Sequence, residues 1–112
     1  MYTQSAGRKL VAARSGGGCE VGILGVCQGV VTNVHHRRKR SHGGSWSPAN
    51  LLGLCGSGTT GCHGYIEAHP NYSRQYGYWI FSGDGEPNAV PVLLHVHTVP
   101  RWFLLDDEGT MT

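Results

Sequence analysis

Two adjacent histidines, His35 and His36, stand directly before a run of four cations, Arg37, Arg38, Lys39 and Arg40. A neutral imidazole can bind a metal ion or accept a proton near neutral pH. Neighbouring cations can bind the phosphates of a polyanion. Successive side chains of a strand point to opposite sides, so one histidine can face a metal while the other faces a substrate. The segment predicts either a hydrolytic centre beside an anion-binding surface or two unrelated surface features.

The four cysteines form two pairs, Cys19 with Cys27 and Cys55 with Cys62. Two close pairs at some distance along the chain are typical of a tetrahedral structural zinc site, although the spacing within these pairs is wider than usual. Glycines inside both pairs give the backbone the freedom to close such a site. Because a small, glycine-rich chain has a modest core, bound zinc would contribute strongly to folding. The alternative is four thiols without a metal.

The chain has 112 residues, of which 18 are glycine, and its formal net charge is +2. Its length indicates one domain, and its charge is too small to identify a partner. The first residues lack the apolar stretch of a signal peptide, and the longest apolar run, over 89–99, is interrupted by proline and histidine. We therefore expect a cytoplasmic protein without a membrane segment, in which paired cysteines bind metal rather than form disulfides.

The elements that must position these residues can be predicted from local sequence. Helix formers predict a short helix over 4–14. The glycine-rich segment 19–31 predicts a tight knuckle, and the β-branched residues of 30–34 predict a strand that ends at the histidines. Turn residues fill 41–50, and the apolar segment 51–54 predicts the returning strand.

The second half of the chain alternates in the same way. A helix is expected over 62–68, with another helical turn at 71–76 that Gly77 can end. Aromatic and β-branched residues predict strands over the remaining apolar segments, with a turn near Pro100 between the last two. These segments are 78–81, 90–99 and 102–105.

Taken together, the segments Val34-His35-His36, Asn50-Leu51-Leu52 and Cys62-His63 resemble the HNH endonuclease family and its ββα-metal motif. The stretch CGSGTTGCHGYIEAHP is similar to small HNH proteins of actinobacterial phages. The resemblance covers about residues 15–72. It implies an α+β single domain with a ββα-metal core at 15–72, a four-cysteine zinc site, a helical N-terminal segment at 1–14 and a β-rich C-terminal extension at 73–112.

The resemblance also implies roles for individual residues. His36 is expected to be the general base that takes a proton from water, and Asn50 to fix the loop and orient His36. His35 and His63 are expected to bind a catalytic divalent ion, for which a histidine-rich site favours Mn²⁺, Ni²⁺ or Zn²⁺ over Mg²⁺. Glu67, one helical turn after His63, stands where many relatives have histidine; it is either a third ligand or a solvated carboxylate.

The function implied is metal-dependent hydrolysis of DNA phosphodiester bonds. The four cations at 37–40 would then hold the DNA backbone, and the alternative is a solvated basic loop. DNA is the expected partner, with phage terminase or packaging proteins as further ones, and the location would be the cytoplasm of the host cell. The alternative function is a zinc-stapled DNA-binding or packaging-accessory module without catalysis.

Overall fold

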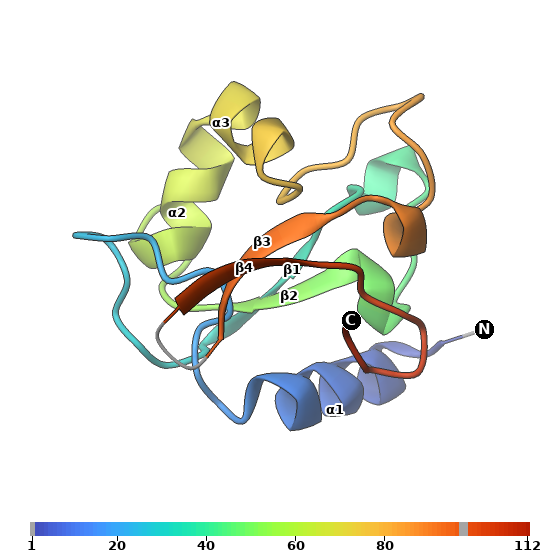
Figure 1. Ribbon diagram of the computed structural model, residues 1–112, viewed down its shortest axis with the longest axis horizontal. Coiled ribbons are helices and arrows are strands. Elements are labelled where there is room, and N and C mark those ends of the chain that lie inside the picture. The colour runs from blue at the N-terminus through green and yellow to red at the C-terminus, as the bar shows by residue number, and fades with distance from the viewer. Residues whose placement is uncertain (1, 97–98) are drawn as a thin grey trace.

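The computed structural model describes residues 2–96 and 99–112 and shows a small α+β fold with two antiparallel sheets, which confirms the expected fold class (Figure 1). None of the helices in this part of the chain is long and apolar enough to cross a membrane. The helices and strands follow in the order α1 (Gln4–Ser15), β1 (Asn33–His36), β2 (Leu51–Leu54), α2 (Gly61–Ala68), α3 (Pro70–Gln75), β3 (Val92–Val96) and β4 (Val99–Phe103). Short 3₁₀ turns lie at Arg40–His42, Pro48–Asn50 and Pro87–Ala89.

The hairpin β1–β2 is the scaffold of the candidate site. Its register places His35 opposite Leu52 and His36 opposite Leu51, and every residue of β2 is buried. Helix α1 lies along one side of this hairpin, α2 and α3 lie on the other, and the hairpin β3–β4 crosses in front (Figure 1). Because β2 is covered by packed elements on both sides, it is a continuous apolar run rather than an alternating one.

Helix α1 is fixed to the hairpin by polar contacts. The Thr3 side chain accepts a hydrogen bond from the N–H of Ala6 at 3.0 Å and caps the first turn. At the other end, Arg14 forms a buried ion pair with Glu20 at 2.8 Å, and Glu20 also accepts from the Gly53 N–H of β2. Residue 7 must be glycine, because a Cβ there would overlap the Trp46 carbonyl oxygen. This close approach brings the start of α1 against the 43–50 loop.

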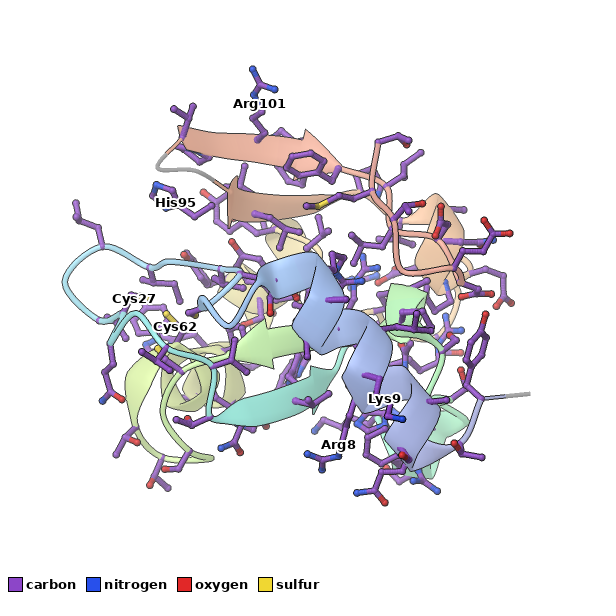
Figure 2. All side chains as sticks on the ribbon, turned by 90° about the horizontal axis from the view of Figure 1, so that it is seen from below. Arg8, Lys9, Cys27, Cys62, His95 and Arg101 are labelled. Carbon is purple, nitrogen blue, oxygen red and sulfur yellow. The ribbon has the colours of Figure 1, made fainter. Side chains whose placement is uncertain are left out.

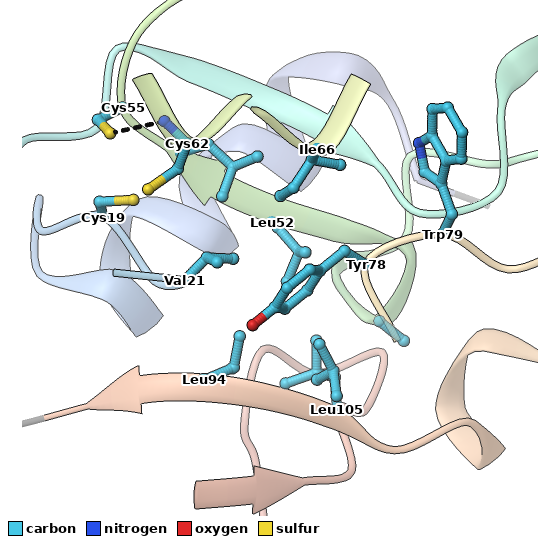
Figure 3. Close-up of a cluster of buried hydrophobic side chains, with 13 residues drawn as sticks. Cys19, Val21, Leu52, Cys55, Cys62, Ile66, Tyr78, Trp79, Leu94 and Leu105 are labelled. Carbon is cyan, nitrogen blue, oxygen red and sulfur yellow. Dashed lines mark hydrogen bonds between the residues drawn. The ribbon is translucent and has the colours of Figure 1, made fainter. Parts of the chain in front are cut away.

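The core lies between the two hairpins and α2. Leu52, Ile66, Tyr78 and Leu94 meet there, and the buried cysteines continue the same apolar cluster (Figure 3). The Tyr78 hydroxyl donates to the Leu93 carbonyl at 2.8 Å, so its polar end is satisfied inside the core.

Three local expectations were displaced. The first strand begins at Asn33 and not at residue 30, and it includes the two histidines expected at its end. Pro100 lies within β4, paired with His95, and not in the turn. Residues 78–81 are not a strand: the N–H groups of Tyr78 and Trp79 donate to Ser73, and that of Ile80 donates to Arg37. The first two N–H groups bond to the carbonyl of a residue in α3, and the third bonds to the residue that follows β1. None of the three is therefore available to pair with another strand.

Candidate metal and nucleic-acid site

The four cysteine sulfurs gather at one place. Their Sγ atoms all lie within 4.8 Å of one another, and those of Cys27 and Cys55 are 4.0 Å apart. Zinc–sulfur bonds of about 2.3 Å in a tetrahedron place the sulfurs about 3.8 Å apart. Cys19, Cys55 and Cys62 are buried while Cys27 is exposed, and Figure 3 shows the sulfurs of Cys19 and Cys62 pointing toward each other. The cluster can therefore bind a structural metal ion such as zinc.

Backbone donors surround these sulfurs. The N–H groups of Ile23 and Gln28 donate to Cys62 Sγ at 3.3 Å and to Cys55 Sγ at 3.2 Å. The N–H of Cys62 also donates to Cys55 Sγ, at 3.2 Å. Hydrogen bonds to the charged form of a group favour that form, so the surrounding backbone stabilises thiolates.

The pKa values of two cysteines move in opposite directions. A hydrogen bond from the Cys62 thiol lowers the pKa of Cys19 to about 4, while the same contact raises the pKa of Cys62. One thiolate thus shares its neighbour's proton, and a metal ion bound by both sulfurs would displace that proton. The loop between Cys55 and Cys62 is tight enough to hold these two cysteines close together. Gly56 in this loop has φ +84°, and a Cβ there would overlap the backbone of Thr60.

His35 belongs to a second cluster, on the α2 side of β1. Its ring is buried, and its Nε2 lies 2.7 Å from the Tyr78 carbonyl oxygen. Because a carbonyl only accepts, Nε2 carries the proton and donates. Nδ1 then faces Glu67 Oε1 at 3.6 Å. By accepting the hydrogen bond from Nε2, the Tyr78 carbonyl fixes the tautomer that leaves Nδ1 free to bind a metal ion.

His63 is held in the same manner by a residue that sequence reasoning missed. Its Nδ1 lies 3.2 Å from Asn33 Oδ1, and Asn33 Nδ2 donates to the carbonyls of Thr32 and Gly56, both at 2.8 Å. The amide orientation is thereby fixed, so Asn33 Oδ1 accepts and His63 Nδ1 donates. His63 Nε2 is then free to bind an ion, 3.4 Å from Glu67 Oε1.

The three groups converge. One ligand atom each from His35, His63 and Glu67 lies within 4.8 Å of the other two. Burial lowers the pKa of His63, and the neighbouring His35 lowers the pKa of Glu67, so a neutral His63 imidazole faces a carboxylate at neutral pH. Three acceptors directed at one point are stable when a cation lies between them. The Glu67 side chain is 36% exposed, so the cluster is open to solvent on that side.

His36 points to the opposite side of β1, as strand geometry requires. Its ring packs edge to face against the Trp46 ring, with the two ring centroids 4.3 Å apart. Its Nε2 is buried and has no hydrogen-bond partner among the described residues. Burial, aided by the charges of Arg40, His35 and Arg8, lowers the pKa of His36 to about 4. The ring is thus neutral at neutral pH, and the described contacts do not bring it onto the cluster of His35, His63 and Glu67.

The Trp46 ring contacts His36 and also two cations, of which Arg8 comes from the distant helix α1 and Arg40 from nearby in the chain. The guanidinium of Arg8, from α1, lies 5.4 Å from the ring centroid, and that of Arg40 lies 5.3 Å from it. Figure 2 shows Arg8 and Lys9 on the outer face of α1. Two exposed guanidinium groups beside a neutral histidine form a surface that favours an anion. No sequence signal linked Arg8 to this place, because the contact depends on the close packing of α1.

Asn50 holds the loop between the strands. Its Oδ1 accepts from the Arg38 N–H at 2.8 Å, and its Nδ2 donates to the carbonyls of Arg38 and Ser45 at 3.1 and 3.0 Å. An amide matches the donor and acceptor of a peptide group, so it pairs with the backbone rather than with an imidazole. The hydrogen bond expected from Asn50 to His36 is not formed within the described residues; Asn50 acts two residues further along.

Arg37 cannot contact DNA in this fold, which corrects the grouping of all four cations as phosphate ligands. Its side chain is 0% exposed. Its guanidinium donates to four carbonyl oxygens at 2.7 to 2.9 Å, those of Gly77, Ala49, Pro87 and Val90. Strand alternation directs Arg37 inward with His35, where it ties segments far apart in the chain together.

The other three cations of the run reach the surface in different directions. Arg38 is half-buried and donates to the Gly85 carbonyl at 2.6 Å. Lys39 lies over Trp79, with Nζ 4.5 Å from the ring centroid, whereas Arg40 lies over Trp46. Within the segment 37–40, Arg37 is therefore buried and holds the fold together, and the cations that follow it lie on two separate surfaces.

No known protein family, curated protein or solved structure matched the chain. Function must therefore be argued from the site.

Proposed function

We propose that the protein is a metal-dependent endonuclease of the HNH type that hydrolyses DNA phosphodiester bonds. The observation that carries the proposal is the convergence of His35, His63 and Glu67 on one solvent-open point, from a strand and a helix of a ββα arrangement. Three protein ligands with an open side are typical of a catalytic rather than a structural metal site.

Each residue has a role that its surroundings support. A divalent ion bound there supplies positive charge that stabilises the phosphate and the leaving oxygen. The Tyr78 carbonyl and the Asn33 amide hold the two imidazoles in the tautomers that bind an ion. Arg8 and Arg40 bind phosphates of the same strand on the His36 side.

His36 is the proposed general base. Its Nε2 is buried, so Nδ1 is the atom to which we assign proton transfer from the attacking water. Nδ1 takes a proton from this water while the oxygen attacks phosphorus and the bond to the leaving oxygen breaks. The low pKa of His36 keeps the ring unprotonated at neutral pH, which a base requires.

Nicking of supercoiled plasmid by zinc-loaded protein tests this proposal, with Mg²⁺, Mn²⁺, Ni²⁺ or Zn²⁺ added or omitted. The ion is omitted rather than chelated, because a chelator would also strip the cysteine cluster. His36→Ala should reduce the rate by about 10²–10⁴-fold. His69→Ala, at an exposed histidine outside both clusters and the cavity described below, is the control and should retain activity.

Wild-type nicking by His36→Ala would contradict the assigned base. The alternative function is a zinc-stapled module that binds DNA or packaging proteins without catalysis, and the separation of His36 from the His35 cluster favours it. Folded, zinc-loaded protein that binds DNA but cleaves with none of the ions would support this alternative and contradict the nuclease.

A further inference from the structure

A cavity of ≈ 290 Å³ lies between the chain that follows β1 and the segment 79–82. One wall is apolar and aromatic, formed by Trp79, Ile80 and Phe81, and Lys39 and the His42 imidazole line the cavity without any acidic residue beside them. Its volume is close to the lower end, about 300 Å³, of pockets that bind small molecules. The lining chemistry suits a flat aromatic group that carries negative charge nearby.

The cavity is connected to the metal cluster through the backbone. Trp79 directly follows Tyr78, whose carbonyl accepts from His35 Nε2 at 2.7 Å. Lys39 lies over the Trp79 ring and also acts electrostatically on Glu67. One exposed cation is therefore near enough to act on both the cavity wall and the cluster.

Trp79 has an unused donor. The residue is only 8% exposed, and its Nε1–H is buried and has no acceptor among the described residues. A buried donor without an acceptor is costly, and native proteins usually satisfy it. The faces of nucleobases stack on aromatic side chains, such as those of Trp79 and Phe81 in the cavity wall.

We propose that this cavity binds an unstacked nucleobase of the strand held at the metal cluster, with Lys39 moving from Trp79 to the adjoining phosphate. The inference rests on the proposed function in that its ligand is a nucleic acid. It adds to that function a preference for strands with a base free to leave the stack, since a paired base must first be extruded.

The test is a coupling experiment with short single-stranded DNA, in which one abasic position is moved along the oligonucleotide. Binding is measured by fluorescence anisotropy on zinc-loaded protein without added divalent ion, so cleavage is not required. For the wild type, one abasic position should weaken binding by about tenfold and the others should have little effect. Phe81→Ala should weaken binding of the intact strand and remove the penalty at that position.

Phe103→Ala is the matched control, because Phe103 is also a partly buried aromatic residue against the core but lies outside the cavity. It should preserve the abasic penalty. Ser82→Trp, at an exposed residue of the cavity rim, should block the base if Phe81→Ala fails to fold. An equal effect of every abasic position, or a penalty unchanged by both cavity variants, would overturn the proposal.

The two proposals fail in different ways. If one abasic position weakens binding but the protein never nicks plasmid, the nuclease proposal is overturned and the base-binding cavity is supported. Metal-dependent nicking without any position-specific penalty would overturn the pocket and leave the nuclease.

Discussion

The two candidate metal clusters both take residues from α2 but differ in composition and exposure. The first has four sulfur ligands, three of them buried, and extends the apolar core. The second has two imidazoles and one carboxylate and is open at Glu67. Cys62 and His63 are neighbours in sequence, yet each belongs to a different cluster. A closed set of four ligands stabilises a fold, whereas an open set of three leaves room for a substrate.

The strongest way to break this comparison is to change those two neighbours. Cys62→Ser should remove the structural metal, whose binding contributes on the order of 10 kcal/mol to folding, as much as a typical domain's whole stability. We expect the variant to be unfolded or nearly so at 37 °C. His63→Ala should melt within a few degrees of the wild type but lose the second ion. Circular dichroism melting and metal analysis measure both. A zinc-free Cys62→Ser protein that melts like the wild type would remove the distinction.

A second comparison divides the basic run itself. Arg37→Ala leaves four buried carbonyl oxygens without their donor, and we expect it to lower the free energy of unfolding by about 3–5 kcal/mol. Arg40→Ala removes an exposed side chain and should change it by no more than about 0.5 kcal/mol. Urea denaturation measures both. Equal effects of the two substitutions would mean that Arg37 is not the anchor its contacts indicate.

Asn33 sharpens the description of the open cluster. Asn33→Ala removes the acceptor that orients His63, and we expect the affinity for Mn²⁺ to fall by about 10–100-fold. Calorimetric titration of zinc-loaded protein provides the measurement, with the exposed Asn71→Ala as a control. Unchanged affinity in Asn33→Ala would show that His63 needs no such support.

The smallest expected effects concern the surface around Trp46. Arg8→Ala and Arg40→Ala should each weaken DNA binding and reduce the slope of log affinity against log salt by about 0.9. Arg101→Ala is the control, because Arg101 lies on β4, far from Arg8 in Figure 2. Titrations at several salt concentrations distinguish these variants. A slope changed by Arg101→Ala and not by Arg8→Ala would place the DNA on another face.

Local sequence was sufficient for several features because their causes are local. The helix that contains Cys62 and His63, the apolar strand β2 and the opposite directions of His35 and His36 follow from propensity and strand alternation. The gathering of four cysteines followed from their pairing and the glycines between them. The segment 78–81 shows the limit: its composition predicts a strand, but its N–H groups bond elsewhere.

Only the tertiary structure decided which cation is buried and which residues join the site. Arg37 and Arg40 are identical in type and three positions apart, yet one donates to four carbonyls from three segments while the other lies over Trp46. Asn33 contacts His63, which is 30 residues further along the chain. Arg8 reaches Trp46 because α1 packs against the loop that contains Trp46. Such contacts depend on where folding places backbone carbonyls and ring faces, and neither composition nor spacing records those positions.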